Sequence, residues 1–159
     1  MPLPPLTGDP IRVVIRRSLG PHVAATSIPR RVIYLDRQVL VERGDFERIL
    51  VHELFHFAWV HLGNSVRREW ELVLEAELAR GDRGELGWSA EWRKKKLSAS
   101  VISLRTTAWR RYVCESFCDT AAWMFAGLAD HDEFTLPVRA RRRRHAWFAR
   151  NFSSTPVRI

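Results

Sequence analysis

The stretch that decides the fold reads ILVHELFHFAW, from Ile49 to Trp59. Its apolar residues fall on every side of a helix with about 3.6 residues per turn, so the pattern predicts a helix that is buried nearly all round. His52, Glu53 and His56 are the polar residues inside it. Buried polar groups need partners, because an unpaired carboxylate in an apolar environment is costly. The stretch therefore predicts a polar site within the core.

The spacing of these polar residues predicts a zinc site. His52 and His56 are four positions apart, hence about 40° apart around the helix axis and one turn along it, so their imidazoles project the same way and can share one ion. Glu53 lies about 100° from His52, beside a zinc-bound water from which it can take a proton as general base. The alternative is a pair of core histidines satisfied by hydrogen bonds.

These residues resemble the zincin metallopeptidases, which share a His-Glu-x-x-His helix. The resemblance implies a zinc-dependent peptidase that hydrolyses peptide bonds in a peptide or protein substrate. One zincin group has Gly and a third His where this chain has Trp59 and Leu62. The third zinc ligand is therefore expected elsewhere in the chain.

Glu115 is the main candidate for that third ligand. It lies four residues before Asp119 in a segment that reads as a helix, so both carboxylates share one face. His61, Glu75 and Glu77 are the alternatives as ligands. The alternative for Glu115 and Asp119 is a solvated polar stripe on an amphipathic helix.

This Glu-x-x-x-Asp arrangement is similar to the second motif of the gluzincins. The resemblance implies that Glu115 is the third zinc ligand and that Asp119 holds the other ring nitrogen of His52. A narrower resemblance is to the cytoplasmic ImmA/IrrE metallopeptidases, on residues 32–36, 46–52 and 115–122.

A donor for the oxyanion of the transition state completes the predicted catalytic residues. Tyr112, one helical turn before Glu115, is the first candidate, and His131 and His145 are further ones. The alternative for Tyr112 is simple packing, with its hydroxyl at the surface.

Length and composition predict one domain. The chain has 159 residues, of which 46% are hydrophobic, enough for a sizeable core. We expect an irregular, proline-rich lead-in over residues 1–10, a single zincin-like domain over residues 11–152 and a tail over residues 153–159.

The pattern along the chain predicts an α+β fold, with a small antiparallel sheet of two to four strands packed on a mostly helical core. We expect strands over residues 11–17 and 31–42, the latter as a strand or short hairpin, and a loop over residues 18–30. Asp45 can cap the first helix. The predicted helices cover residues 46–62, 66–80, 89–97, 106–128 and 138–152.

Charge and cysteine content bear on partners and compartment. The net charge is +8, much of it from the Arg-rich run 139–144, which reads as a solvated helix face or, alternatively, as a nucleic-acid contact. No membrane span or secretion signal is expected. Cys114 and Cys118 are expected as free thiols in the cytoplasm, although two cysteines can also bind metal.

The leading functional prediction is thus a cytoplasmic zinc peptidase. A basic nucleic-acid-binding or regulatory protein with a structural zinc, and a zincin without activity, are the alternatives. For the substrate, residues 31–35 are expected to offer a strand edge to an extended peptide. Trp88 and Trp92 are expected to pack a short helix or to form a cleft wall.

Overall fold

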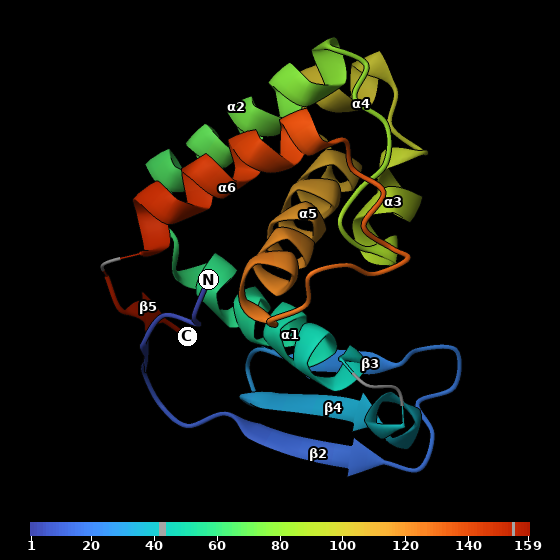
Figure 1. The fold of residues 1–159 in the computed structure, drawn as a ribbon, viewed down its shortest axis with the longest axis vertical. Coiled ribbons are helices and arrows are strands. Elements are labelled where there is room, and N and C mark those ends of the chain that lie inside the picture. Colours follow the sequence, from blue (N-terminus) through green and yellow to red (C-terminus); the bar gives the residue numbers. More distant parts are fainter. Residues whose placement is uncertain (42–43, 154) are drawn as a thin grey trace.

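The computed structural model describes residues 1–41, 44–153 and 155–159, and it contains both helices and strands (Figure 1). The strands are β1 (Leu6–Thr7), β2 (Arg12–Arg16), β3 (Ala24–Ser27), β4 (Val32–Asp36) and β5 (Val157–Arg158). The helices are α1 (Asp45–His61), α2 (Asn64–Ala79), α3 (Trp88–Lys94), α4 (Ala99–Ser103), α5 (Thr107–Phe125) and α6 (Val138–Phe152), with a short 3-10 helix η1 (Arg37–Leu40) before α1. The predicted α+β class is confirmed.

The main sheet has three strands in the order β2-β4-β3. β4 pairs in parallel with β2 and antiparallel with β3, so the prediction of a purely antiparallel sheet is wrong. The segment between β2 and β4 crosses over and places β3 at the sheet edge. That segment was expected to be a loop, because Ala24, Ala25, Thr26 and Ser27 lack the bulky β-branched pattern of a typical strand.

The central place of β4 corrects a second expectation. Residues 31–35 were predicted as the free edge, but β4 has a neighbour on each side. Val32, Ile33 and Leu35 are accordingly buried. The chain then continues as η1 and not as the second half of a hairpin, with the side chain of Asp36 accepting a hydrogen bond from the backbone of Gln38. Glu42, where that strand was predicted to end, lies outside the described residues.

Helix α1 lies between the sheet and α5 (Figure 1). Ile49 and Phe57 pack toward the sheet with Ile33 and Leu35. On the opposite side, Phe55 belongs to the large cluster of buried apolar residues built around α5. Burial on two sides explains why apolar residues surround this helix in the sequence.

Aromatic side chains fill the space between α1, α5 and the outer helices. Phe117 on α5 has its ring centroid 5.8 Å from that of Phe55 and 5.2 Å from that of Phe148 on α6. Trp70 on α2 is fully buried, and its indole nitrogen donates a hydrogen bond to the carbonyl of Val113 at 3.1 Å. This cluster holds α5 in a fixed position relative to α1.

The helix predictions agree closely with the structure, with three exceptions. The fourth predicted helix ends at Phe125 and not at residue 128, and the third predicted helix begins at Trp88 and ends at Lys94. Helix α4 was not predicted. The residue that caps α1 is Gly44, whereas the side chain of Asp45, expected as the cap, pairs with Arg48 and His131.

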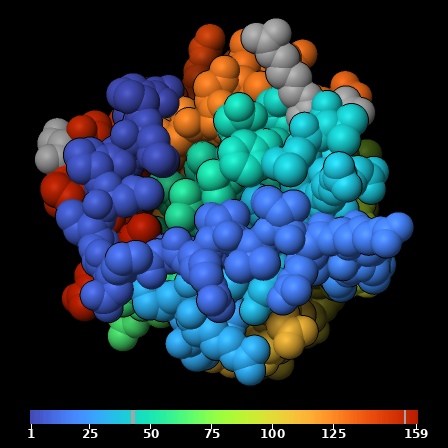
Figure 2. Space-filling model, turned by 90° about the horizontal axis from the view of Figure 1, so that it is seen from below, coloured from blue at the N-terminus to red at the C-terminus, as the bar shows by residue number. Residues whose placement is uncertain are grey.

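The two terminal segments pair with each other. β1 and β5 form a parallel two-stranded sheet in which Leu6 lies opposite Val157 and Thr7 opposite Arg158. Figure 2 shows the N-terminal segment in blue against the red C-terminal segment. The lead-in over residues 1–10 and the tail over residues 153–159, of which residue 154 is outside the described part, therefore contain paired strands.

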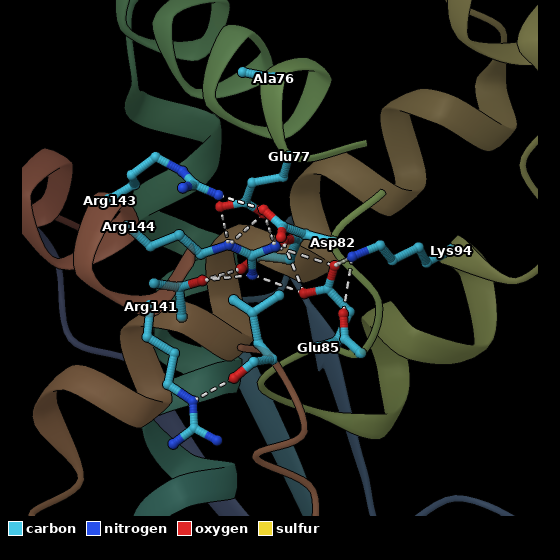
Figure 3. A network of polar contacts seen from close by, with 12 residues as sticks. Ala76, Glu77, Asp82, Glu85, Lys94, Arg141, Arg143 and Arg144 are labelled. Carbon is cyan, nitrogen blue, oxygen red and sulfur yellow. Dashed lines mark hydrogen bonds and ion pairs between the residues drawn. The ribbon is translucent and has the colours of Figure 1, made fainter. Parts of the chain in front are cut away.

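The Arg-rich run is bound largely to the protein itself. Arg144 is fully buried, with one guanidinium nitrogen 2.7 Å from Glu77 and another 2.7 Å from Glu85 (Figure 3). Arg139 and Arg143 both pair with Asp82. The prediction of a solvated face is therefore wrong for Arg144, because this position of α6 faces α2 and the loop before α3.

Within the described part of the chain, no helix combines the length and the apolar character needed to cross a membrane.

Candidate metal centre

His52 and His56 face each other on one side of α1. Their ring centroids are 4.9 Å apart, and their Nε2 atoms are 3.2 Å apart. Two nitrogen ligands at 2.0–2.1 Å from one tetrahedral ion lie about 3.3 Å from each other. The two imidazoles therefore have the separation that a shared metal ion requires.

Glu115 of α5 reaches the same point. Its Oε2 atom lies 3.3 Å from Nε2 of His52 and accepts a hydrogen bond of 2.7 Å from the Ser89 hydroxyl. Its Oε1 atom pairs with Arg93 at 3.1 Å. Burial alone would raise the pKa of this carboxyl. The neighbouring His52, together with His56 and Ser89, outweighs burial and lowers the pKa to about 2. Glu115 is therefore held as a carboxylate that faces the histidines.

Asp119 holds the opposite edge of the His52 ring. Its Oδ1 atom is 2.7 Å from Nδ1 of His52, and its Oδ2 atom accepts a 3.0 Å hydrogen bond from the backbone of Ala90 at the start of α3. When Nδ1 of His52 keeps its proton and donates a hydrogen bond to Asp119, the lone pair of Nε2 points toward His56 and Glu115. Asp119 thus fixes the tautomer that a metal ligand needs.

Gly87 makes room for this carboxylate. A Cβ atom on residue 87 would lie 2.3 Å from Cγ of Asp119, closer than any side chain allows. The backbone of residue 87 is extended, so the requirement is for space and not for an unusual conformation. The sequence showed three glycines in this loop, but only the packing of α3 on α5 identifies the one that the site needs.

The charge of His52 follows from its two acidic neighbours. Burial lowers the pKa of the imidazole, while Asp119, followed by Glu115, raises it well above the usual value of 6.5. The carboxylates therefore favour positive charge at the point where Nε2 faces His56.

Glu53 points from α1 toward the edge strand β3. Its Oε2 atom accepts a 2.5 Å hydrogen bond from the hydroxyl of Thr26. The side chain is largely buried but lines the hollows on both sides of His52. Thr26 was not predicted, because it lies in the strand that the sequence pattern did not reveal.

Two thiols adjoin the second histidine. Sγ of Cys114 and Sγ of Cys118 are each 3.5 Å from Nδ1 of His56. One ligand atom from each of His52, His56 and Cys118 lies within 4.8 Å of the others, a grouping compatible with a metal ion. A hydrogen bond with Cys118 lowers the pKa of the Cys114 thiol to about 6, whereas burial raises the pKa of Cys118. Both cysteines are free, as predicted.

Tyr112 does not lie at this site, which corrects its prediction as the oxyanion donor. It is fully buried, and its hydroxyl donates a 2.6 Å hydrogen bond to Glu85. Although Tyr112 is one turn from Glu115, the two side chains diverge enough to reach different neighbours. The weaker candidates are also engaged elsewhere: His131 contacts Asp45, and His145 contacts Trp123.

The alternative third ligands have other surroundings in the structure. Glu75 pairs with Arg68 and Arg105, and Glu77 pairs with Arg144. His61 is exposed at the end of α1. Of the acidic residues considered from the sequence as ligands, Glu115 is the one that contacts His52.

Two hollows flank the histidines along β3. The larger, of about 390 Å³, is lined by His52 and Glu53 together with Val23, Ile49 and Trp88. The smaller, of about 320 Å³, shares His52 and Glu53 and extends to the thiol of Cys114. The polar site therefore lies in the middle of a groove that continues on both sides.

Helix α3 carries two tryptophans near this groove, and one of them lines it. Trp88 lines the larger hollow and is 64% exposed, so it belongs to the cleft wall. Trp92 stacks on it, with ring centroids 6.1 Å apart, but does not line that hollow. The cleft-wall alternative thus applies to Trp88, whereas Trp92 is 43% exposed and contacts Trp88 along the same helix.

Comparison with known proteins gives no match: no protein-family model, no curated protein sequence and no solved structure is similar to this chain.

Proposed function

We propose that this protein is a zinc-dependent peptidase in which His52, His56 and Glu115 hold the metal and Glu53 is the general base. One observation carries the proposal: Nε2 of His52 lies 3.2 Å from Nε2 of His56 and 3.3 Å from Oε2 of Glu115, at the middle of a groove. Both distances match the separation of about 3.3 Å between ligands of one tetrahedral ion.

The donor set also fits zinc. Two imidazoles and one carboxylate, with an open fourth position, are typical of catalytic zinc sites. Cys118 is the competing third ligand, but it lies against Nδ1 of His56, the ring nitrogen on the other side from the Nε2 that faces His52. This favours Glu115. A bound zinc ion would supply a Lewis acid that polarises the substrate carbonyl and acidifies water.

The residues around the metal position have separate tasks. Asp119 holds the ring of His52 in one orientation and one tautomer. Glu53 accepts a proton from the attacking water and passes it to the leaving amine nitrogen. The Thr26 hydroxyl holds one oxygen of Glu53 through its hydrogen bond, so that the other oxygen is directed to the proton.

The groove favours an extended peptide as substrate. β3 has one unpaired edge in the three-stranded sheet, and residues Ala24 and Thr26 line the smaller hollow. A peptide can add to such an edge through backbone hydrogen bonds. The larger hollow, with Val23, Ile49 and Trp88 in its wall, suits an apolar side chain of that peptide.

The test is a peptide-library digest combined with metal analysis. Glu53→Gln is expected to lower turnover by about 10²–10⁴-fold while one zinc per chain remains, because only the proton acceptor is lost. His52→Ala is expected to lose the zinc. Glu47→Gln, an exposed position on the same helix, is the matched control. Unchanged turnover in Glu53→Gln would refute the mechanism.

A further inference from the structure

His56 differs from His52 in what holds its second ring nitrogen. Nδ1 of His52 meets the carboxylate of Asp119 at 2.7 Å. Nδ1 of His56 instead meets two sulfur atoms, those of Cys114 and Cys118, each at 3.5 Å. Because the two cysteines are four residues apart on α5, their side chains leave the same face of the helix. One imidazole nitrogen and two thiols thus converge on one point.

The separations fit a metal ion. A nitrogen at 2.0–2.1 Å and a sulfur at about 2.3 Å from one tetrahedral ion lie about 3.6 Å from each other. Both observed nitrogen–sulfur distances are 3.5 Å. Both sulfur atoms therefore have the distance from Nδ1 of His56 that ligands of one ion would have.

An ion can reach this point from solvent. Cys114 and His56 line the smaller hollow, whereas Cys118 is fully buried behind them. The cluster therefore has one open side, toward the groove, and is closed by the core on the other.

We propose that Cys114, Cys118 and Nδ1 of His56 form a second metal site, for a thiophilic ion such as copper(I). Two sulfurs and one imidazole are soft ligands that select copper(I) over magnesium or calcium. On binding, each sulfur forms one bond to copper as a thiolate, any proton that it still carries goes to solvent, and no oxidation state changes.

Use of this site excludes His56 from the first one. A neutral imidazole has one lone-pair nitrogen and one N–H, so a metal on Nδ1 puts the proton on Nε2. Copper(I) binding is therefore expected to displace a zinc ion held by His52, His56 and Glu115. The second site stands without the peptidase proposal, while this displacement rests on it.

The experiment transfers copper(I) anaerobically from its coloured bathocuproine disulfonate complex to the zinc-free protein, and the loss of colour measures the transfer. The wild type is expected to take one copper per chain. Cys114→Ser and Cys118→Ser are each expected to abolish the transfer, with circular dichroism to verify folding. Cys114 is only half-buried, so its variant tests the site even if Cys118→Ser fails to fold.

His52→Ala distinguishes the second site from the first. This variant is expected to bind copper(I) as the wild type does, although it has lost a ligand of the first site. Loss of copper in His52→Ala would overturn the proposal, because it would show one site that His52 and Cys118 share. Unchanged transfer in both cysteine variants would overturn it as well. Glu53→Gln affects neither result, so failure of the peptidase mechanism leaves this test intact.

For displacement, copper(I) is added to zinc-loaded protein and the released zinc is measured with a chromophoric chelator. Release of one zinc per copper bound supports the shared use of His56. Retention of zinc at full copper occupancy would overturn it.

Discussion

Helix α5 contributes to two polar clusters that differ in charge balance. On one side, Glu77 and Glu85 face Arg144 and Lys94, and all four side chains are at most 9% exposed (Figure 3). Two carboxylates are matched by two cations, and Tyr112 adds a hydrogen bond to Glu85. The charges of this ion network are balanced by side chains of the protein itself. Its members are Glu77, Glu85, Lys94, Arg144 and Tyr112.

The candidate metal centre on the other side has a different charge balance, because part of its positive charge comes from its own histidines, whose pKa values are raised. Three carboxylates lie around the two histidines, those of Glu53, Glu115 and Asp119. In the described part of the chain, one arginine pairs with them, Arg93 with Glu115, and no lysine does. A divalent cation bound by the two imidazoles would take the place of the protons that the carboxylates favour there. The comparison teaches that the ion network is neutralised by lysine and arginine side chains, whereas the charge of the candidate metal centre depends on what its imidazoles bind, a proton or a cation.

The largest expected effect comes from breaking the ion network. Arg144→Met leaves Glu77 and Glu85 buried without their shared partner, which typically costs about 3–5 kcal/mol of unfolding free energy. Urea unfolding followed by circular dichroism measures the loss. Arg142→Met makes the same chemical change at an exposed position of α6 and is expected to stay within about 0.5 kcal/mol of the wild type. Equal losses in the two variants would remove the distinction between the network and the surface.

Zinc should stabilise the protein through the other cluster. At a free concentration of 100 times Kd, a ligand that binds only the folded state adds about 2.7 kcal/mol. His52→Ala is expected to lose this increment, whereas His61→Ala, at the exposed end of the same helix, should keep it. Thermal unfolding with and without zinc gives the increment. A gain that survives in His52→Ala would show that the ion binds elsewhere.

A smaller effect is expected from the residue that orients the ligand. Asp119→Asn keeps the shape of the side chain but weakens its hold on His52, so zinc affinity should fall by about 10–100-fold. Competition with a chelator of known affinity measures the change. Asp130→Asn, an exposed change of the same kind, is the control. If both variants bind zinc like the wild type, Asp119 has no positioning role.

The smallest effect concerns how the free energy of unfolding falls at acid pH. Burial alone would raise the pKa of Glu85. Arg144, together with Lys94 and Tyr112, outweighs burial, so the pKa lies below its ordinary value of 4.5. The network therefore contributes stability above about pH 4.5, and this contribution is lost as the pH falls through the lowered pKa. One proton gives a slope of at most about 1.4 kcal/mol per pH unit, and Glu85→Gln should reduce the slope measured by urea unfolding. An unchanged slope would assign the acid sensitivity to other carboxylates.

Local periodicity predicted the residues that share a helix. His52 and His56, and likewise Glu115 and Asp119, are four apart, and this spacing fixes their common direction whatever surrounds them. The long helices were predictable for the same reason. That the two pairs meet was expected from the resemblance to gluzincins, and the observed distances agree with that expectation.

Contacts between distant segments were not predictable from the sequence. Thr26 lies in a strand with little hydrophobic pattern, and its contact with Glu53 depends on the crossover that makes β3 an edge. The burial of Arg144 depends on Glu77 and Glu85, which are remote in sequence. Tyr112 was assigned to the wrong cluster because one helical turn of separation does not decide which of two neighbours a side chain meets.

The contacts on both faces of α5 limit where related sequences can gain or lose residues. Tyr112, Ser116 and Thr120 contact the ion network, while Glu115 and Asp119 contact His52 on α1. A shift of one residue in the register of this helix turns it by about 100° and would disrupt both sets of contacts together. Insertions and deletions are therefore expected to be tolerated in the connections that flank this helix but not within residues 107–125.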